Sequence, residues 1–527
     1  MNETAVRAHP IRWPHGAALV ALLALYLAVS LHRLDVVPPV YEDEPWQAST
    51  GLKLAREGVF GSDLFAGLWG SEHRHYWFMP LHPLLLAATY RVAGFGLFQT
   101  RLEPVAMGLA VLLLTYALGR RLFGPTVGLA AVAALLMVRT AGLTRSQPTG
   151  ILLVDFTRIA RYDPLVPVLG LAALHVYLWA ERRSDLRLHA LAGVLAGMTG
   201  LAHLYGAFWI AVLAVLSVWN RSGWRALAAL GAGCAVPCLA YLVYVLGDVP
   251  DWIAQTRGYA PRFGLLDPSW YWHNLAGEFH RYGPGLGPPG LEWVRRPGFF
   301  VALGTVPASL AALARRATQG DWRARAVVAP ALVFPVLFAL LITLKLANYL
   351  LTVVPLGALA AAWGGVTAWR RSTPMRRGLS LRVALAAAAL TVAAEGGSRY
   401  LALQRTAAST TPYGTFIARV RAAVPPASRI LGQHSFWFGL EGFDFRAVDV
   451  PLLLADARYT SPPLPLEATL ENIAPSVVLV DARLRAYMTG TPDLLAAGLH
   501  TWIERGFTLT ATIPDPTYGT MEVFCRR

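Results

Sequence analysis

The sequence has few charged residues, almost no lysine and few cysteines. Charged residues make up 15% of its 527 positions, against roughly 25% in a typical soluble domain. The three cysteines fit neither a zinc site nor the disulfide framework of a small secreted domain. A composition with so many apolar and so few charged residues also excludes a disordered chain. It gives no indication of a nucleic-acid-binding arm.

What the chain has in excess is apolar surface. Hydrophobic residues make up 55% of the sequence, and the mean hydropathy is +0.45. This composition predicts a polytopic α-helical membrane protein. The formal net charge is +15, and only two of the 46 basic residues are lysines, Lys53 and Lys345. In a membrane protein such a basic excess indicates cytoplasmic loops rather than a nucleic-acid partner.

A membrane-spanning helix needs about 20 mostly apolar residues, and the sequence predicts about eleven such spans. They lie at residues 15–32, 102–119, 125–142, 162–180, 187–202, 205–219, 225–246, 297–314, 326–344, 350–369 and 382–397. The fifth and sixth meet at His203 and allow a merged alternative. We favour two separate spans, because the arginine pairs between helices then all fall on one side.

The arginine-rich side is expected to be cytoplasmic, together with the N-terminus. The outer side of the cell (inner) membrane then receives two loops, residues 33–101 and 247–296, and the C-terminal tail. In the first loop, 45–57 and 83–93 are predicted to be helices at the membrane surface.

The C-terminal tail has a different pattern from the rest of the chain. Its apolar runs are short, as at 429–433, 476–481 and 507–513, and helical patterns lie between them. Such alternation predicts a small α/β domain. We therefore expect a transmembrane domain over residues 1–397 and a soluble extracytoplasmic domain over residues 398–527.

Acids near the outer membrane face are the first candidates for chemistry, because ionisable groups at membrane depth are costly and tend to be functional. Glu42, Asp43 and Glu44 come shortly after the first span. A carboxylate held near a substrate hydroxyl can act as a general base. The alternative is an acidic N-cap for the helix that begins at Pro45.

Two later segments bring basic groups to the same outer level. Arg161 and Asp163 lie at the outer start of the fourth span, where an arginine suits a phosphate group and Asp163 also suits a helix N-cap. Lys345 and Tyr349 lie between the ninth and tenth spans. Lys345 is predicted to contact a lipid phosphate, with a snorkelling helix-end cation as the alternative.

Histidines form a further set of candidates. His73 and His75 lie in a His-x-His pattern that could ligate a metal, but we favour a polar cleft or interface here, with His82 nearby. His203, at the break between the fifth and sixth spans, is expected either to face the same cavity or to be a satisfied helix-end group.

Four of these segments together resemble the GT-C glycosyltransferases that use polyprenyl-phosphate sugars, the superfamily of protein O-mannosyltransferases and lipid A aminoarabinose transferase. They are YEDEPWQAS after the first span, the surface helix and arginine-led second span from Met79, RIARYDPLVPVL at the fourth span, and KLANYLLTVVPLG at the tenth. The departure is Pro80-Leu81-His82-Pro83, where this superfamily usually has Pro-Pro.

The resemblance implies a membrane glycosyltransferase that acts at the outer face of the membrane. 

By that resemblance Asp43 is the base that takes a proton from the acceptor, and Glu44 orients the substrate. Arg161, Lys345 and Tyr349 hold the donor phosphate, Asp163 holds the sugar or a cation, and His82 and His203 line the substrate cavity. Inverting, metal-free transfer is expected, with a divalent cation as the alternative.

The resemblance also defines the partners and the rival functions. The donor is a polyprenyl-phosphate sugar, and the acceptor is an envelope lipid, polysaccharide or protein. A transporter or flippase for a polyprenyl-linked sugar would need the same cavity and cations but no base. Transporters usually place their sites near the midplane between repeated halves, and the sequence has no such repeats. A binding protein that uses the tail as its module is the third hypothesis.

Overall fold

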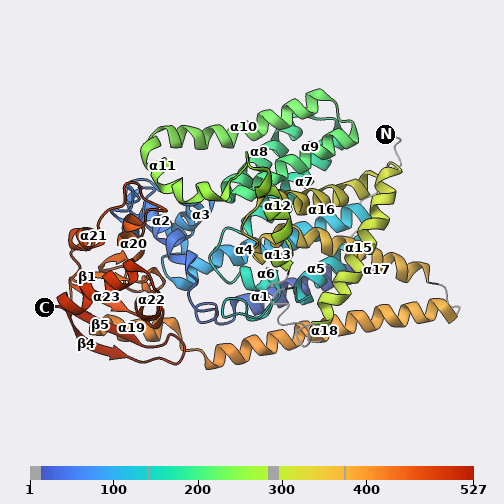
Figure 1. Cartoon of the computed structure of the whole chain (residues 1–527). Helices are drawn as coiled ribbons and strands as arrows, with labels where there is room; N and C mark the ends of the chain where they lie inside the picture. Colours follow the sequence, from blue (N-terminus) through green and yellow to red (C-terminus); the bar gives the residue numbers. More distant parts are fainter. Residues whose placement is uncertain (1–12, 141, 283–295, 373–375) are drawn as a thin grey trace.

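The computed structural model describes residues 13–140, 142–282, 296–372 and 376–527. Apolar helices form the larger part of the molecule, and a smaller domain with a β-sheet lies at one end of them (Figure 1). Residues 1–12 of the predicted transmembrane domain and residues 283–295 of the second predicted outer loop lie outside the described residues.

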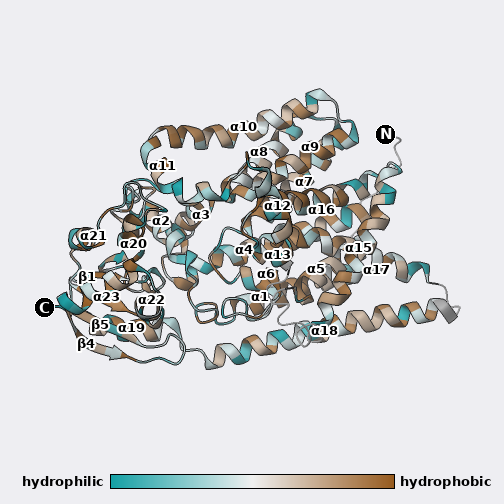
Figure 2. Cartoon of the chain, viewed as in Figure 1, coloured by the Kyte–Doolittle hydropathy of each residue, from teal (hydrophilic) through white to brown (hydrophobic). Residues whose placement is uncertain are grey.

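A helix lies at each of the predicted spans. These helices are α1 (Trp13–Leu31), α4 (Leu97–Phe123), α5 (Pro125–Met137), α7 (Leu165–Arg183), α8 (Leu186–Ala202), α9 (Phe208–Asn220), α10 (Trp224–Leu246), α15 (Pro297–Thr318), α16 (Trp322–Leu341), α17 (Val354–Arg371) and α18 (Arg376–Ser409). Within the described ranges, seven helices are long and apolar enough to cross a membrane, and α5, α8 and α9 are shorter apolar helices. Figure 2 shows many hydrophobic residues along these helices, and the helices make the chain a multi-pass membrane protein.

Short helices connect the long ones. On the side of the sheet domain they are α2 (Asp43–Glu57), η1 (Asp63–Phe65), α3 (Leu81–Ala93), α6 (Leu152–Phe156), η2 (Leu204–Ala207), α11 (Val249–Thr256), η3 (Arg257–Arg262), α12 (Pro268–Gly277), α13 (Phe279–Tyr282) and η4 (Ala347–Thr352). The two predicted surface helices are confirmed as α2 and α3, and α2 begins two residues earlier than expected.

The C-terminal domain is a small α/β fold, as predicted. Its strands are β1 (Arg429–Gly432), β2 (Asp444–Ala447), β3 (Val477–Val480), β4 (Phe507–Ile513) and β5 (Met521–Arg526), in the order β2-β1-β3-β5-β4. The first three strands are parallel, and β5 runs antiparallel to both β3 and β4. Its helices are α19 (Tyr413–Ala423), η5 (His434–Phe436), α20 (Asp449–Ala455), α21 (Leu466–Ile473), α22 (Ala482–Gly490) and α23 (Leu494–Gly506).

The C-terminal domain shares a hydrophobic core with the surface helices of the first outer loop. Trp46 and Leu86, from α2 and α3, belong to the same buried cluster as Phe416 and Trp437 of the C-terminal domain. Trp46 also stacks on Phe65, with ring centroids 3.5 Å apart. Because burial of aromatic surface is the largest favourable contribution to such packing, this core holds α2 firmly against the sheet domain.

Glycines allow α8 and α10 to pack closely. A Cβ atom added to Gly233 would lie 1.9 Å from the carbonyl oxygen of Ala190, and one added to Gly193 would lie 2.1 Å from that of Leu230. Small residues at such contacts let helix backbones approach, which is how many membrane helices associate.

The glycine contact gives a test of this packing. Gly233→Ala should lower the free energy of unfolding by about 1–3 kcal/mol, because the added methyl group meets backbone that cannot move aside. Gly231→Ala is the matched control, since a Cβ at Gly231 has nothing within 4 Å. Thermal unfolding in detergent measures both, and equal melting temperatures for the two variants would contradict the close contact.

Candidate active site

Three consecutive acids at the start of α2 pair with three different arginines. The ion pairs are Glu42 with Arg483, Asp43 with Arg161, and Glu44 with Arg101. The N-cap residue Glu42 makes no side-chain capping hydrogen bond, so capping does not account for this acidic run. The helix N-terminus still favours the negative charges, and each carboxylate ties α2 to another part of the chain.

Glu44 is fully buried beneath the site. Its Oε1 accepts hydrogen bonds from Nε of Arg101 and from the backbone N–H of Ala160, at 2.7 and 2.8 Å. Its Oε2 accepts from Nη2 of Arg101 and from the backbone N–H of Tyr41, both at 2.7 Å. With four donors on two oxygens, Glu44 has no surface left for substrate in this structure. We infer that it positions its neighbour Asp43.

Asp43, Arg161 and Asp163 form one network, so the structure brings together three of the predicted site residues. Nη1 of Arg161 donates to Oδ2 of Asp43, and its Nε donates to Oδ2 of Asp163 at 2.6 Å. The Arg161 guanidinium also lies 5.0 Å from the ring of Tyr41 and 5.2 Å from that of Tyr162. The side chain of Asp43 is 28% exposed, whereas Asp163 is fully buried. Asp43 is therefore the acid that a substrate can reach.

Asp163 connects this network to the segment that carries Tyr349. Its Oδ1 accepts a hydrogen bond of 2.8 Å from Nδ2 of Asn348. The ring of Tyr349 lies 5.2 Å from that of His203 and 4.6 Å from that of Tyr205. Two predicted residues, Tyr349 and His203, thus lie in an aromatic cluster directly beside the acids.

Burial favours the neutral form of His203. Burial lowers the pKa of His203 to about 4, although Asp163 acts in the opposite direction. The imidazole is therefore neutral near pH 7, and it can offer a substrate a ring face or a neutral hydrogen-bonding group, but no positive charge.

Lys345 lies in a second charged cluster. Its Nζ is 2.8 Å from Oε2 of Glu278 and also donates to the carbonyl oxygen of Phe338 at 3.1 Å. Arg281 binds the same carboxylate, with Nε 2.7 Å from Oε1 of Glu278, and its guanidinium lies 5.7 Å from the ring of Tyr349. Two cations share one acid, so this cluster keeps a net positive charge next to Tyr349. Burial lowers the pKa of Lys345, and the pairing with Glu278 opposes that shift.

His82 occupies a different place from the one expected of a substrate contact. It is fully buried, with Nε2 3.2 Å from Oε2 of Glu103 and Nδ1 3.4 Å from Oε1 of Gln47. A bound substrate cannot touch it in this structure, because α2, α3 and α4 enclose it. His75 is likewise buried, and burial lowers its pKa to about 3. Among the described residues, no group of three or more His, Cys, Asp and Glu side chains could hold a metal ion.

Several residues of the site were not predicted from the sequence. They are Arg101, Asn348, Arg262, Glu278 and Arg281. Arg262, at the end of η3, is exposed, and its charge acts on both His203 and Tyr349. No carboxylate in the described parts of the chain pairs with it. The second predicted outer loop thus supplies three charged groups, Arg262, Glu278 and Arg281. The only indication of them in the sequence was the predicted position of this loop on the outer side of the membrane.

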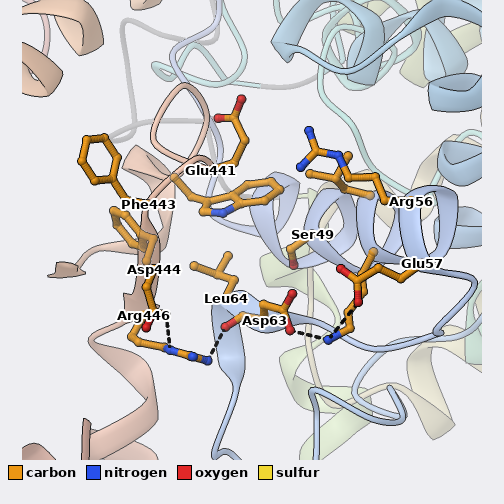
Figure 3. Close-up of a pocket in the computed structure, with 13 residues that line it drawn as sticks. Ser49, Arg56, Glu57, Asp63, Leu64, Glu441, Phe443, Asp444 and Arg446 are labelled. Carbon is orange, nitrogen blue, oxygen red and sulfur yellow. Dashed lines mark hydrogen bonds and ion pairs between the residues drawn. The ribbon is translucent and has the colours of Figure 1, made fainter. Parts of the chain in front are cut away.

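A cavity lies at the other end of α2 from Asp43. It has a volume of about 300 Å³ and lies between α2 and the β2 region of the C-terminal domain (Figure 3). Lys53 pairs there with Asp63, and Nη1 of Arg446 donates to the carbonyl oxygen of Asp63 at 2.8 Å. The contact from Arg446 joins the C-terminal domain to the segment that carries α2 and η1. Most of its charges are therefore already paired within the protein.

This arrangement of helices with a C-terminal sheet domain is the GT-C fold. The structure of ArnT from Cupriavidus metallidurans bound to undecaprenyl phosphate superposes with a TM-score of 0.60 at 15% identity, over 96% of this chain and 97% of that chain. No protein-family model and no curated protein sequence matches this chain.

A second similar structure comes from the archaeon Archaeoglobus fulgidus. Its oligosaccharyltransferase in the apo form has a TM-score of 0.55 at 12% identity, over 98% of this chain and 75% of that chain. The same organism's oligosaccharyltransferase AglB, in complex with an inhibitory peptide and a dolichol-phosphate, has a TM-score of 0.54 at 11% identity. At these identities the likeness establishes the fold.

The buried pair beneath the site can be tested by stability. Glu44→Gln should lower the free energy of unfolding by about 3–5 kcal/mol, because it leaves the buried Arg101 without a counter-charge. Asp43→Asn should cost far less, since Asp43 is partly exposed. Thermal unfolding in detergent compares the two. A Glu44→Gln protein as stable as the wild type would show that the Arg101 pair does not support the site.

Proposed function

We propose that this chain is a membrane glycosyltransferase that moves a sugar from a polyprenyl-phosphate donor to an acceptor at the outer face of the membrane. The observation that carries the proposal is the Asp43 carboxylate, which is partly exposed and anchored through one oxygen by Arg161. Its fold neighbours support the donor class, because ArnT is described with undecaprenyl phosphate and AglB with a dolichol-phosphate.

In the proposed reaction the acceptor hydroxyl attacks the anomeric carbon of the sugar. The new C–O bond forms as the bond between that carbon and the phosphate oxygen breaks, and the bonding electrons leave with the polyprenyl phosphate. Asp43 takes the proton from the acceptor hydroxyl through its free carboxylate oxygen. Attack from the face opposite the phosphate inverts the anomeric centre.

Cations beside Tyr349 would stabilise the phosphate charge that grows during this step. Arg281 and Lys345 share Glu278, and Arg262 is exposed with no carboxylate partner in the described ranges. Arg161 is less available to bind the donor phosphate, because its guanidinium already binds Asp43 and Asp163. We therefore assign the donor phosphate to Lys345, Tyr349 and Arg262, and we assign Arg161 to holding the two acids.

The acids of this site do not fit a divalent cation. The Arg161 guanidinium lies between Asp43 and Asp163 and provides the positive charge that a metal ion would otherwise supply. The other oxygen of Asp163 is bound by Asn348. We derive no step through a metal ion.

The orientation of the chain follows from the same proposal. Asp43, Lys345 and the C-terminal domain lie at the end of the helices opposite the arginine pairs at the ends of α7 and α17. If the arginine-rich end faces the cytoplasm, the N-terminus is cytoplasmic and transfer occurs on the extracytoplasmic side of the cell membrane.

Asp43→Asn tests the proposed base. This variant should lose at least about a hundredfold in transfer rate, the lower end of the contribution of general acid–base catalysis, while it still binds donor and remains folded. The assay follows label from polyprenyl-phosphate sugars into a crude envelope extract, with protein in lipid. Glu57→Gln, at the exposed far end of α2, is the control and should keep full activity.

The same assay separates the enzyme from a transporter. Transfer at the wild-type rate by Asp43→Asn would remove Asp43 as the base. Donor binding without any transfer by the wild-type protein, unchanged in the variant, would favour movement of a lipid-linked sugar across the membrane instead.

The phosphate assignment is tested at the two lysines of the chain. Lys345→Ala should weaken donor binding about tenfold, which corresponds to about 1.4 kcal/mol, and Lys345→Arg should retain most of the affinity. Lys53→Ala removes the same charge in the distant cavity of Figure 3 and should leave donor binding unchanged. Equal affinities for all three variants in a donor titration would refute the role of Lys345.

A further inference from the structure

A second cavity lies at the opposite ends of the helices from Asp43. Its volume is about 170 Å³, and it lies where α4, α15 and α17 end and where α5 and α16 begin. Its lining residues are Leu122, Phe123, Val127, Arg316, Arg323, Trp363, Val366, Thr367 and Arg370. Three arginines thus meet in one cavity, and none of its lining residues is acidic.

The three arginines are only partly neutralised. Arg316 forms an ion pair with Asp321 at 2.6 Å, and its guanidinium lies 5.4 Å from the ring of Trp363. Arg370 approaches the hydroxyl of Thr126 at 3.5 Å, and the guanidinium of Arg323 lies 5.6 Å from the ring of Trp322.

Neither Arg323 nor Arg370 pairs with a carboxylate in the part of the chain that the structure describes. Within the described ranges, Asp321 is therefore the single acid bound to this cluster, and two positive charges are left without a carboxylate.

The general excess of arginine on this side does not by itself explain such a cavity. Such an excess places basic residues near the helix ends. Arg182 and Arg183 at the end of α7 are an example, and both are exposed. The excess does not explain why arginines from three different helices converge on one cavity. Like charges repel each other, so such convergence is unfavourable by itself. Their convergence is favourable when an anion lies between them.

The walls of the cavity indicate what kind of anion would fit. Phe123, Val127 and Val366 give it an apolar side next to the arginines. A planar guanidinium binds phosphate through paired hydrogen bonds, and basic pockets between membrane helices on the cytoplasmic side bind lipid head groups. The volume is below the roughly 300–1,000 Å³ of ligand pockets, so it suits one phosphate group rather than a whole ligand.

We propose that this cavity binds the phosphate group of an anionic phospholipid from the leaflet on the arginine-rich side. Arg323 and Arg370 bind the phosphate, Arg316 and Trp363 border it, and the apolar wall contacts the start of an acyl chain. This lipid site is separate from the proposed active site and does not depend on the glycosyltransferase proposal.

The test measures phospholipid binding to the full-length protein in detergent by native mass spectrometry. Wild-type protein should retain phosphatidylglycerol at least about tenfold more tightly than phosphatidylcholine. Arg323→Gln combined with Arg370→Gln should remove this preference. Arg182→Gln combined with Arg183→Gln removes the same charge on the same side, outside the cavity, and should keep it. Arg323→Lys combined with Arg370→Lys should keep part of it.

Three outcomes would overturn the proposal. If both glutamine double variants lost the preference for phosphatidylglycerol equally, the preference would reflect the general positive charge of this side. Equal retention of the two lipids by the wild-type protein would show that no anionic site exists. Displacement of phosphatidylglycerol by an equal concentration of inorganic phosphate would show that the site takes a soluble anion. Matching gel-filtration profiles and melting temperatures for the variants establish that the comparison is between folded proteins.

Discussion

The buried pair of Arg101 and Glu44 is the interaction on which the candidate active site of this molecule depends. The guanidinium binds both oxygens of Glu44 and also donates from Nη1 to the carbonyl oxygens of Leu34 and Pro38, at 2.7 and 2.8 Å. One side chain of α4 thereby fixes both the start of α2 and the chain that leads into it. Since a charge pair in the interior is stable only when its remaining groups are hydrogen-bonded, this saturated arrangement holds Asp43 in place.

The second support for the site comes from the C-terminal domain. Its hydrophobic core continues into α2 and α3, and Arg483 reaches the Glu42 carboxylate. The helix that begins with Asp43 is therefore held from both sides, by a membrane helix through Glu44 and by the sheet domain through Glu42 and Trp46. This placement gives the domain a structural role in the site in addition to any contact with an acceptor.

The two ends of the helical part differ in how their charges are balanced. At the end that carries Asp43, each acid of the Glu42–Glu44 run has an arginine, and Arg281 and Lys345 share Glu278. At the other end, Arg323 and Arg370 border a cavity whose lining has no acid. At the end that carries Asp43 the charged side chains are held in fixed positions by their partners, whereas at the other end Arg323 and Arg370 have no carboxylate partner among the described residues.

The sequence by itself determined the membrane class, the positions of the helices, the two surface helices and most strands of the C-terminal domain, because hydropathy and its period are local properties. It also indicated Asp43, Arg161 and Asp163 as neighbours of one site. Only the tertiary structure decided that Glu44 is buried by Arg101, that His82 is enclosed, and that Asn348 binds Asp163 from 185 positions away. The physical reason is that hydropathy specifies which segments are buried, whereas the partner of a buried polar group depends on which helices pack against each other.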